Sequence, residues 1–132
     1  HVRMIPPLIE DQFKQLLQSS PNAVIQEIGD GSIWVIVPDL EVRPAEGWSK
    51  QKVTARFLLP LGFPQARPDC FWVDPDLRLA GGGVPQNAAL QEAPHGAGLQ
   101  LWFSWHVAHW NPQVDTIQTY LKVIRQRLQE AR

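Results

Sequence analysis

Proline is the residue that most limits how this chain can fold. The chain has 12 prolines, and they concentrate between residues 60 and 75 and recur at Pro85, Pro94 and Pro112. Proline fixes φ and removes a backbone donor, so it interrupts helices and central strands. The middle of the chain therefore cannot be a long helix, and short strands and loops are expected there.

Helical periodicity occurs near both ends of the chain. Apolar residues from Leu8 to Ser19 recur at the spacing of one helix face. A second helix is expected from Asp115 to Ala131, with Asp115 as its N-cap. The apolar stripe of this second helix consists of Ile117, Tyr120, Leu121, Ile124 and Leu128. Its basic residues, Lys122, Arg125 and Arg127, lie in the second half, where they complement the helix dipole.

Four short strands are expected between the helices, at residues 23–28, 33–37, 53–59 and 70–73. The run Gly29-Asp30-Gly31 is a hairpin signal, and residues 53–59 alternate apolar and polar side chains. Consecutive strands joined by turns favour an antiparallel meander. The whole order predicts an α+β fold: an N-terminal helix, a four-stranded antiparallel meander, a long loop and a C-terminal helix.

The long loop is expected from Ala80 to Gly98. This segment holds a triple glycine and two prolines, and it has no clear period. A structureless segment of this length is unusual in a compact domain and is more often functional or mobile. The glycines do not indicate a phosphate loop, because no Lys-Ser/Thr pair follows them.

Size and charge limit the class of the protein. The 132 residues suit one domain, residues 1–132. Twelve Lys and Arg against 13 Asp and Glu give a net charge of −1, so no nucleic-acid partner is expected. No apolar run reaches the roughly 20 residues of a membrane span, and residues 1–4 lack the apolar core of a signal peptide. With one cysteine and hence no internal disulfide, a cytoplasmic protein without a membrane partner is expected.

Two segments carry a family resemblance. Residues 63–72 read Phe-Pro-Gln-Ala-Arg-Pro-Asp-Cys-Phe-Trp and resemble the Tyr-Pro-Phe-x-Pro-Pro-x-Val-x-Phe signature of ubiquitin-conjugating enzymes. Residues 110–117 read Trp-Asn-Pro-Gln-Val-Asp-Thr-Ile and resemble the Trp-Ser-Pro-Ala-Leu-Thr-Ile of the same enzymes. Residues 102–106 read Trp-Phe-Ser-Trp-His and are followed by the Trp-Asn-Pro of residues 110–112. This combination resembles the bacterial branch of the superfamily called prokaryotic family E.

The resemblance covers most of the chain, from Leu8 to Leu128, and implies a ubiquitin-conjugating-enzyme-like fold. It implies a transferase that works with a ubiquitin-activating-like enzyme and a ubiquitin-like protein. Members of this branch are associated with JAB-type peptidases in gene clusters linked to phage defence, so a role in such a pathway is implied. No cofactor is expected.

The chain departs from the family where the chemistry lies. The family's His-Pro-Asn, whose Asn helps to stabilise the oxyanion, corresponds to Asp-Leu-Arg-Leu at residues 76–79. The family's nucleophilic cysteine lies a few residues before Trp-x-Pro, where this chain has none. Counted back from Trp110 without gaps, the position of the family's cysteine falls near Trp102. If the segment before Trp110 is two residues shorter here than in the family, the position falls on Ser104. Cys70 takes the place of the signature's core Val on a strand, where a small buried residue is expected.

One hypothesis is acyl transfer by serine. Ser104 would take the carboxyl terminus of the ubiquitin-like protein as an oxyester, with His106 as the base or as an orienting group. A serine hydroxyl is a poor nucleophile unless a base takes its proton, and a neutral imidazole suits that task. The two side chains can meet only if residues 104–106 are extended.

The alternative is a catalytically inactive variant that binds the activating enzyme or the ubiquitin-like protein as a scaffold. Aromatic side chains dominate many interfaces. The expected contacts are Phe63, Trp102, Trp105, His109 and Trp110, with the proline-rich segment 62–67.

A metal site is a further alternative. His106 and His109 lie three residues apart, with His95 and Asp115 nearby in the sequence. Zinc needs three or four ligands, and a lone histidine pair is more often hydrogen-bonded structure. No metal site is therefore predicted from these four residues.

Overall fold

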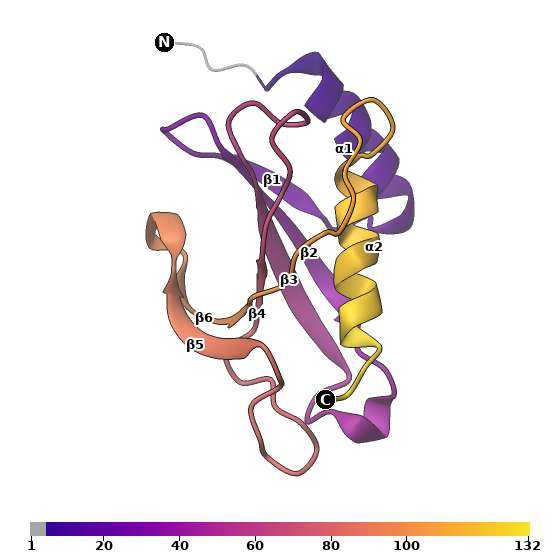
Figure 1. The fold of residues 1–132 in the computed structure, drawn as a ribbon, viewed down its shortest axis with the longest axis vertical. Coiled ribbons are helices and arrows are strands. Elements are labelled where there is room, and N and C mark those ends of the chain that lie inside the picture. The colour runs from indigo at the N-terminus through magenta and orange to yellow at the C-terminus, as the bar shows by residue number, and fades with distance from the viewer. Residues whose placement is uncertain (1–4) are drawn as a thin grey trace.

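The computed structural model describes residues 5–132 as a six-stranded antiparallel sheet with two helices on one face (Figure 1). The helices are α1 (Pro7–Ser19) and α2 (Ile117–Leu128). The strands are β1 (Val24–Glu27), β2 (Ile33–Glu41), β3 (Lys52–Leu59), β4 (Phe71–Val73), β5 (Ala88–Ala93) and β6 (Gly98–Phe103), in the sheet order β1-β2-β3-β4-β6-β5. Within residues 5–132, neither helix is long and apolar enough to cross a membrane. The expectation for residues 1–4 lies outside the described part.

The predicted α+β order is confirmed, but the strand count and the long loop are wrong. Residues 80–98 contain the whole of β5, which pairs with β6 from Ala88↔Phe103 to Ala93↔Gly98. The sequence pattern does not reveal β5 because this strand lies at the edge of the sheet and half of its residues are exposed. An exposed edge strand needs no alternation of apolar and polar residues.

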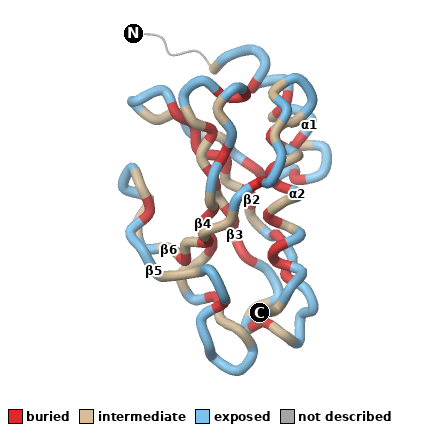
Figure 2. Tube along the Cα trace, viewed as in Figure 1, coloured by how far each residue is buried: buried red, intermediate tan, exposed pale blue. Residues whose placement is uncertain are grey.

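The main core lies between the helices and one face of the sheet. In β3 the side chains of Val53, Ala55, Phe57 and Leu59 point into this core, as the alternation predicts. Figure 2 shows that buried residues lie along the inner strands and the facing sides of the helices, whereas the residues at the loop tips are exposed.

A second apolar cluster covers the other face of the sheet. Trp34 of β2 meets Trp72 of β4 edge to face, with ring centroids 5.4 Å apart. The β5–β6 hairpin curls over on this side, as Figure 1 shows, and brings Ala93 and Ala97 against the two indoles. The hairpin tip also approaches Asp30, whose Oδ2 lies 3.6 Å from the Nε2 of His95.

Two expectations for α2 need correction: its bounds, which are Ile117–Leu128 and not residues 115–131, and its N-cap. The helix begins at Ile117 and its N-cap is Thr116, which forms a capping box with Thr119. Asp115 instead accepts a hydrogen bond from the backbone N–H of Asn111 and closes the preceding turn. Arg127 lies in the last turn of the helix, as expected, and its whole side chain is buried.

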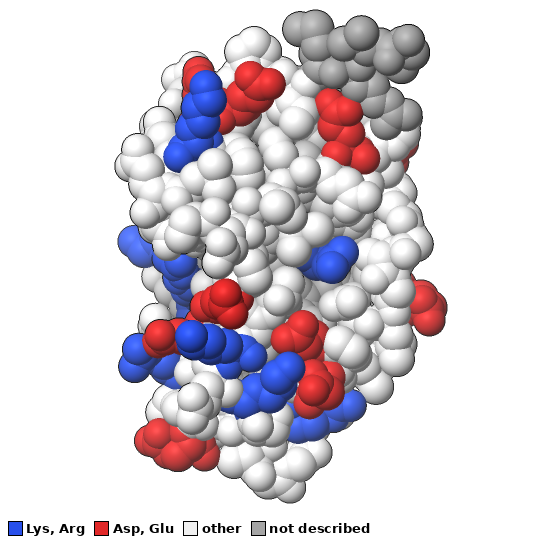
Figure 3. All heavy atoms as spheres, turned by 180° about the vertical axis from the view of Figure 1, so that it is seen from behind, with Lys and Arg blue, Asp and Glu red and all other residues white. Residues whose placement is uncertain are grey.

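Charged side chains of both signs are mixed on the surface. Figure 3 shows this for the face opposite to that of Figure 1, where basic and acidic groups lie side by side in the lower half. One such arrangement in the chain is Lys50, which pairs with both Asp74 and Asp76 at 3.2 and 3.0 Å.

Candidate functional site

The site lies where β4 begins and β6 ends. The two strands pair over three positions, the last being Phe71↔Phe103. Just beyond that pair, the N–H of Cys70 donates to the carbonyl of Trp105 at 3.0 Å. This pairing places the segment Asp69–Cys70 beside residues 104–106, although the two segments are far apart in the sequence.

Cys70 has a left-handed backbone, with φ of +63°. This region is unfavourable for a residue with a side chain, and such strain is found at functional sites when neighbouring contacts hold it. Here the hydroxyl of Tyr120 on α2 donates to the Cys70 carbonyl at 2.7 Å and also reaches the Trp105 carbonyl at 3.3 Å. Strand β4 begins at Phe71, so Cys70 precedes it, and the expectation that Cys70 lies on the strand is wrong.

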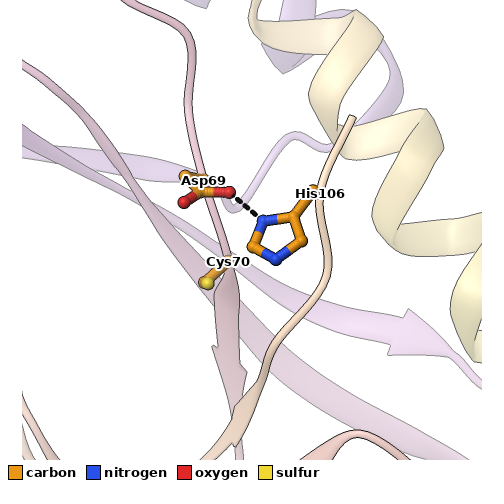
Figure 4. A group of neighbouring side chains, drawn as sticks. All are labelled: Asp69, Cys70 and His106. Atoms are coloured by element: carbon orange, nitrogen blue, oxygen red, sulfur yellow. Dashed lines mark hydrogen bonds and ion pairs between the residues drawn. The ribbon is translucent and has the colours of Figure 1, made fainter. Parts of the chain in front are cut away.

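Three chemically active side chains meet at this point. The Nδ1 of His106 hydrogen-bonds the carboxylate of Asp69, and Figure 4 shows the imidazole next to both Asp69 and Cys70. One ligand atom from each of Asp69, Cys70 and His106 lies within 4.8 Å of the other two. The His106 and Asp69 side chains are 57% and 56% exposed, so a partner can reach them from solvent.

The surroundings of Cys70 keep its thiol protonated. Partial burial raises the pKa of the thiol, and the negative charge of Asp69 raises it further. Contacts from the Trp105 backbone and the Trp102 side chain lower the pKa and oppose part of this rise. At neutral pH the sulfur is therefore a neutral thiol, which needs a base before it can act as a nucleophile.

Ser104 follows β6 directly, and its N–H donates to the carbonyl of Asn87 at 2.8 Å. The segment 104–106 has no helix, as the serine hypothesis requires. Within residues 5–132, however, no hydrogen bond joins the Ser104 hydroxyl to His106, whose Nδ1 is engaged by Asp69.

The residues expected to bind a partner lie in separate places. Trp102 packs against the second apolar cluster, whereas Trp105 and Trp110 pack against the main core. Phe63 is buried, and its ring lies 5.9 Å from that of Trp110. His109 is exposed on the loop before α2.

The four residues weighed for a metal do not form one group. His95 pairs with Asp30 on the hairpin, and Asp115 closes its own turn. Asp69 was missed by sequence reasoning, although it precedes Cys70 directly. Only the spatial pairing of β4 with β6 identifies Asp69 as the partner of His106.

Replacing Tyr120 with phenylalanine should lower the free energy of unfolding by about 1–2 kcal/mol. The substitution keeps the ring against Phe57 but leaves the Cys70 carbonyl without its donor and removes the weaker of the two donors to the Trp105 carbonyl. Urea denaturation would measure the change. An unchanged free energy would mean that the hydroxyl does not hold the left-handed Cys70.

Replacing Asp69 with asparagine should speed alkylation of Cys70 by iodoacetamide about two- to fivefold at pH 8, since the exposed carboxylate is partly screened. Loss of the negative charge lowers the pKa of the thiol and raises the thiolate fraction. Asp76→Asn is the matched control, because Asp76 follows the opposite end of β4. Equal alkylation rates in the two variants would show that Asp69 does not affect the pKa of the Cys70 thiol.

Comparison with known proteins supports one family. The family model described as Prokaryotic E2 family E matches residues 10–131. Neither a search of curated proteins nor a search of solved structures found a match. The family match supports a conjugating-enzyme-like role, in which the chain works with an activating enzyme and a ubiquitin-like protein. Since the match spans nearly the whole chain and the fold agrees with it, the chain belongs to prokaryotic E2 family E.

Proposed function

We propose that this protein accepts the carboxyl terminus of a ubiquitin-like protein from an activating enzyme and holds it as an acyl group on Cys70. The observation that carries the proposal is the meeting of a thiol, an imidazole and a carboxylate at the β4–β6 junction. These are the parts of a nucleophile with its base and an orienting group. The position differs from that of the family's cysteine, which lies later in the chain.

Each of the three residues has a distinct role. Asp69 accepts the Nδ1 proton of His106, which leaves Nε2 with a free lone pair. His106 takes the thiol proton as the sulfur attacks the carbonyl carbon of the activated terminus. The bond from that carbon to its carrier on the activating enzyme then breaks, and the carrier leaves with the proton from His106. The separations of up to 4.8 Å must shorten in the complex, as they often do on substrate binding.

Ser104 remains the second candidate for the acceptor. Its place directly after β6 and two residues before His106 supports the oxyester expected from the sequence. A serine oxyester would use the same His106 as its base. The two acceptors differ in their chemistry, because a thioester exchanges with added thiol and an oxyester does not.

A scaffold role is favoured by a separate observation. The indole N–H of Trp110 donates to the Pro64 carbonyl at 2.7 Å and joins the β3–β4 loop to the loop before α2. These joined loops carry Leu61 and Val114, which are 73% and 69% exposed. Exposed apolar side chains on neighbouring loops suit a partner surface. A chain that only positions its partners would need this surface and no nucleophile.

The test is the intact mass of the protein after incubation with its activating enzyme, ATP and the ubiquitin-like protein. We expect an adduct that dithiothreitol removes, that is lost in Cys70→Ala and that persists in Ser104→Ala. An adduct that survives dithiothreitol and is lost only in Ser104→Ala would assign the oxyester instead. A stable complex on a sizing column without any adduct would support the scaffold.

The pathway is part of the same proposal. The family resemblance supports a bacterial conjugation system that acts in the cytoplasm in phage defence. Cells that carry the gene cluster with Cys70→Ala should lose protection in a plaque assay. Full protection by this variant would mean that phage defence does not require acyl transfer to Cys70.

A further inference from the structure

We propose that Asp69, Cys70 and His106 form a binding site for Zn²⁺, and that the bound ion reversibly blocks the Cys70 thiol. The blocking of acyl transfer rests on the proposed function, whereas the binding of the ion does not. The three donors are a thiol sulfur, an imidazole nitrogen and a carboxylate oxygen, each within 4.8 Å of the other two. Zn²⁺ binds all three of these ligand types.

The geometry is close to that of a zinc site with three protein ligands. With Zn–S of about 2.3 Å and Zn–N or Zn–O of about 2.0 Å, tetrahedral donors lie about 3.3–3.6 Å apart. Donors at the observed limit of 4.8 Å must close by about 1.2–1.5 Å, whereas the hydrogen-bonded atoms of Asp69 and His106 must move apart. More than half of the Asp69 and His106 side chains is exposed, so both can rotate without repacking the core. A water molecule would complete the coordination on the open side.

The backbone holds the ligand segments in place before any ion binds. The bond from the Cys70 N–H to the Trp105 carbonyl joins the two segments. The Tyr120 hydroxyl holds the same two residues from the helix side. Only the exposed side chains, and not the chain path, have to adjust when the ion enters.

Binding exchanges protons for the metal and changes no oxidation state. The thiol proton leaves to solvent, and the sulfur becomes a thiolate ligand. The hydrogen bond between Asp69 and His106 opens, and each group places one atom on the ion. The charge of Zn²⁺ offsets the carboxylate that otherwise opposes the thiolate. A sulfur that is bound to zinc cannot attack a carbonyl until the ion leaves.

The test uses the full chain alone, without the activating enzyme, and Co²⁺ as the spectroscopic probe. We expect one Co²⁺ per chain, with thiolate-to-metal charge transfer and the strong visible bands of four-coordinate cobalt. Zn²⁺ should displace the Co²⁺. The charge-transfer band should disappear in Cys70→Ser, and the affinity should fall at least tenfold in Asp69→Asn and in His106→Gln.

His95→Gln is the matched control, because His95 forms the other histidine–aspartate pair of the described residues. Its Co²⁺ affinity should equal that of the parent chain. A band that persists in Cys70→Ser, or an affinity that falls equally in His95→Gln, would overturn the site. So would the absence of charge transfer in the parent chain.

Alkylation provides a second measurement that does not depend on acyl transfer. One equivalent of Zn²⁺ should slow the reaction of Cys70 with iodoacetamide at least tenfold, and a chelator should restore the rate. Protection without an acyl adduct would leave the zinc site intact and reject the acyl-transfer proposal. An acyl adduct without protection by Zn²⁺ would support the acyl-transfer proposal and reject the zinc site.

Discussion

Replacing His106 with glutamine should lower the rate of acyl transfer to the protein by about 100-fold or more, which is the usual contribution of a general base. The thiol of Cys70 has a raised pKa, so little thiolate exists at neutral pH without a base. Glutamine keeps the size and polarity of the side chain but cannot take the thiol proton. The rate of adduct formation at saturating activating enzyme measures this step.

Two further results separate catalysis from structure. The His106→Gln variant should recover part of its rate at high pH, because solvent then removes the thiol proton. The His95→Gln variant removes a comparable surface pair with Asp30 and should keep the parent rate. An equal loss in both variants, or a loss that high pH does not relieve, would show that His106 acts only by holding the loop.

Replacing Arg127 with methionine should lower the free energy of unfolding by about 3 kcal/mol, an unusually large change for one substitution on a helix. The guanidinium is fully buried and donates to the carbonyls of Gln86, Glu130 and Arg132 at 2.7–2.9 Å. Methionine replaces the apolar stem but removes three hydrogen bonds from a charged group, each of which contributes about 1.5–3 kcal/mol. The Gln86 carbonyl loses its donor, whereas the Glu130 and Arg132 carbonyls each keep a backbone N–H donor. The cost of burying the charge offsets part of this sum, and burial accordingly lowers the pKa of Arg127.

The guanidinium also lies between two aromatic rings. Its central carbon is 5.1 Å from the Phe103 ring centroid and 5.3 Å from that of Trp105. Arg127→Lys keeps the charge but loses the planar fork, so an intermediate loss is expected. Lys122→Met on the exposed side of α2 is the control and should change the free energy by less than about 0.5 kcal/mol. Equal urea midpoints for Arg127→Met and Lys122→Met would contradict this account.

Periodicity predicted the parts of the fold that face the main core. Ile117, Tyr120, Leu121, Ile124 and Leu128 are all buried, because a helix on a sheet must present one apolar stripe. Strand β3 follows its alternation for the same reason. Strand β5 was missed because an exposed edge strand imposes no such pattern, and its identity depends on backbone pairing with β6.

The candidate site was predicted only in part. The family motifs drew attention to residues 104–106, and His106 is one of the three residues that meet there. The meeting of Asp69 and Cys70 with His106 could not be predicted, since Asp69 and His106 lie 37 positions apart in the chain. Their contact depends on the three-residue pairing of β4 with β6 and on a positive φ at Cys70, which no local pattern encodes.

The site forms only when β6 has paired with β4, because this short pairing brings the two halves of the site together. Asp69 and Cys70 precede β4 and His106 follows β6, and β5 pairs with the sheet through β6. A chain whose last hairpin has not docked holds Cys70 apart from His106. Under the proposed mechanism, such a chain would not accept the acyl group.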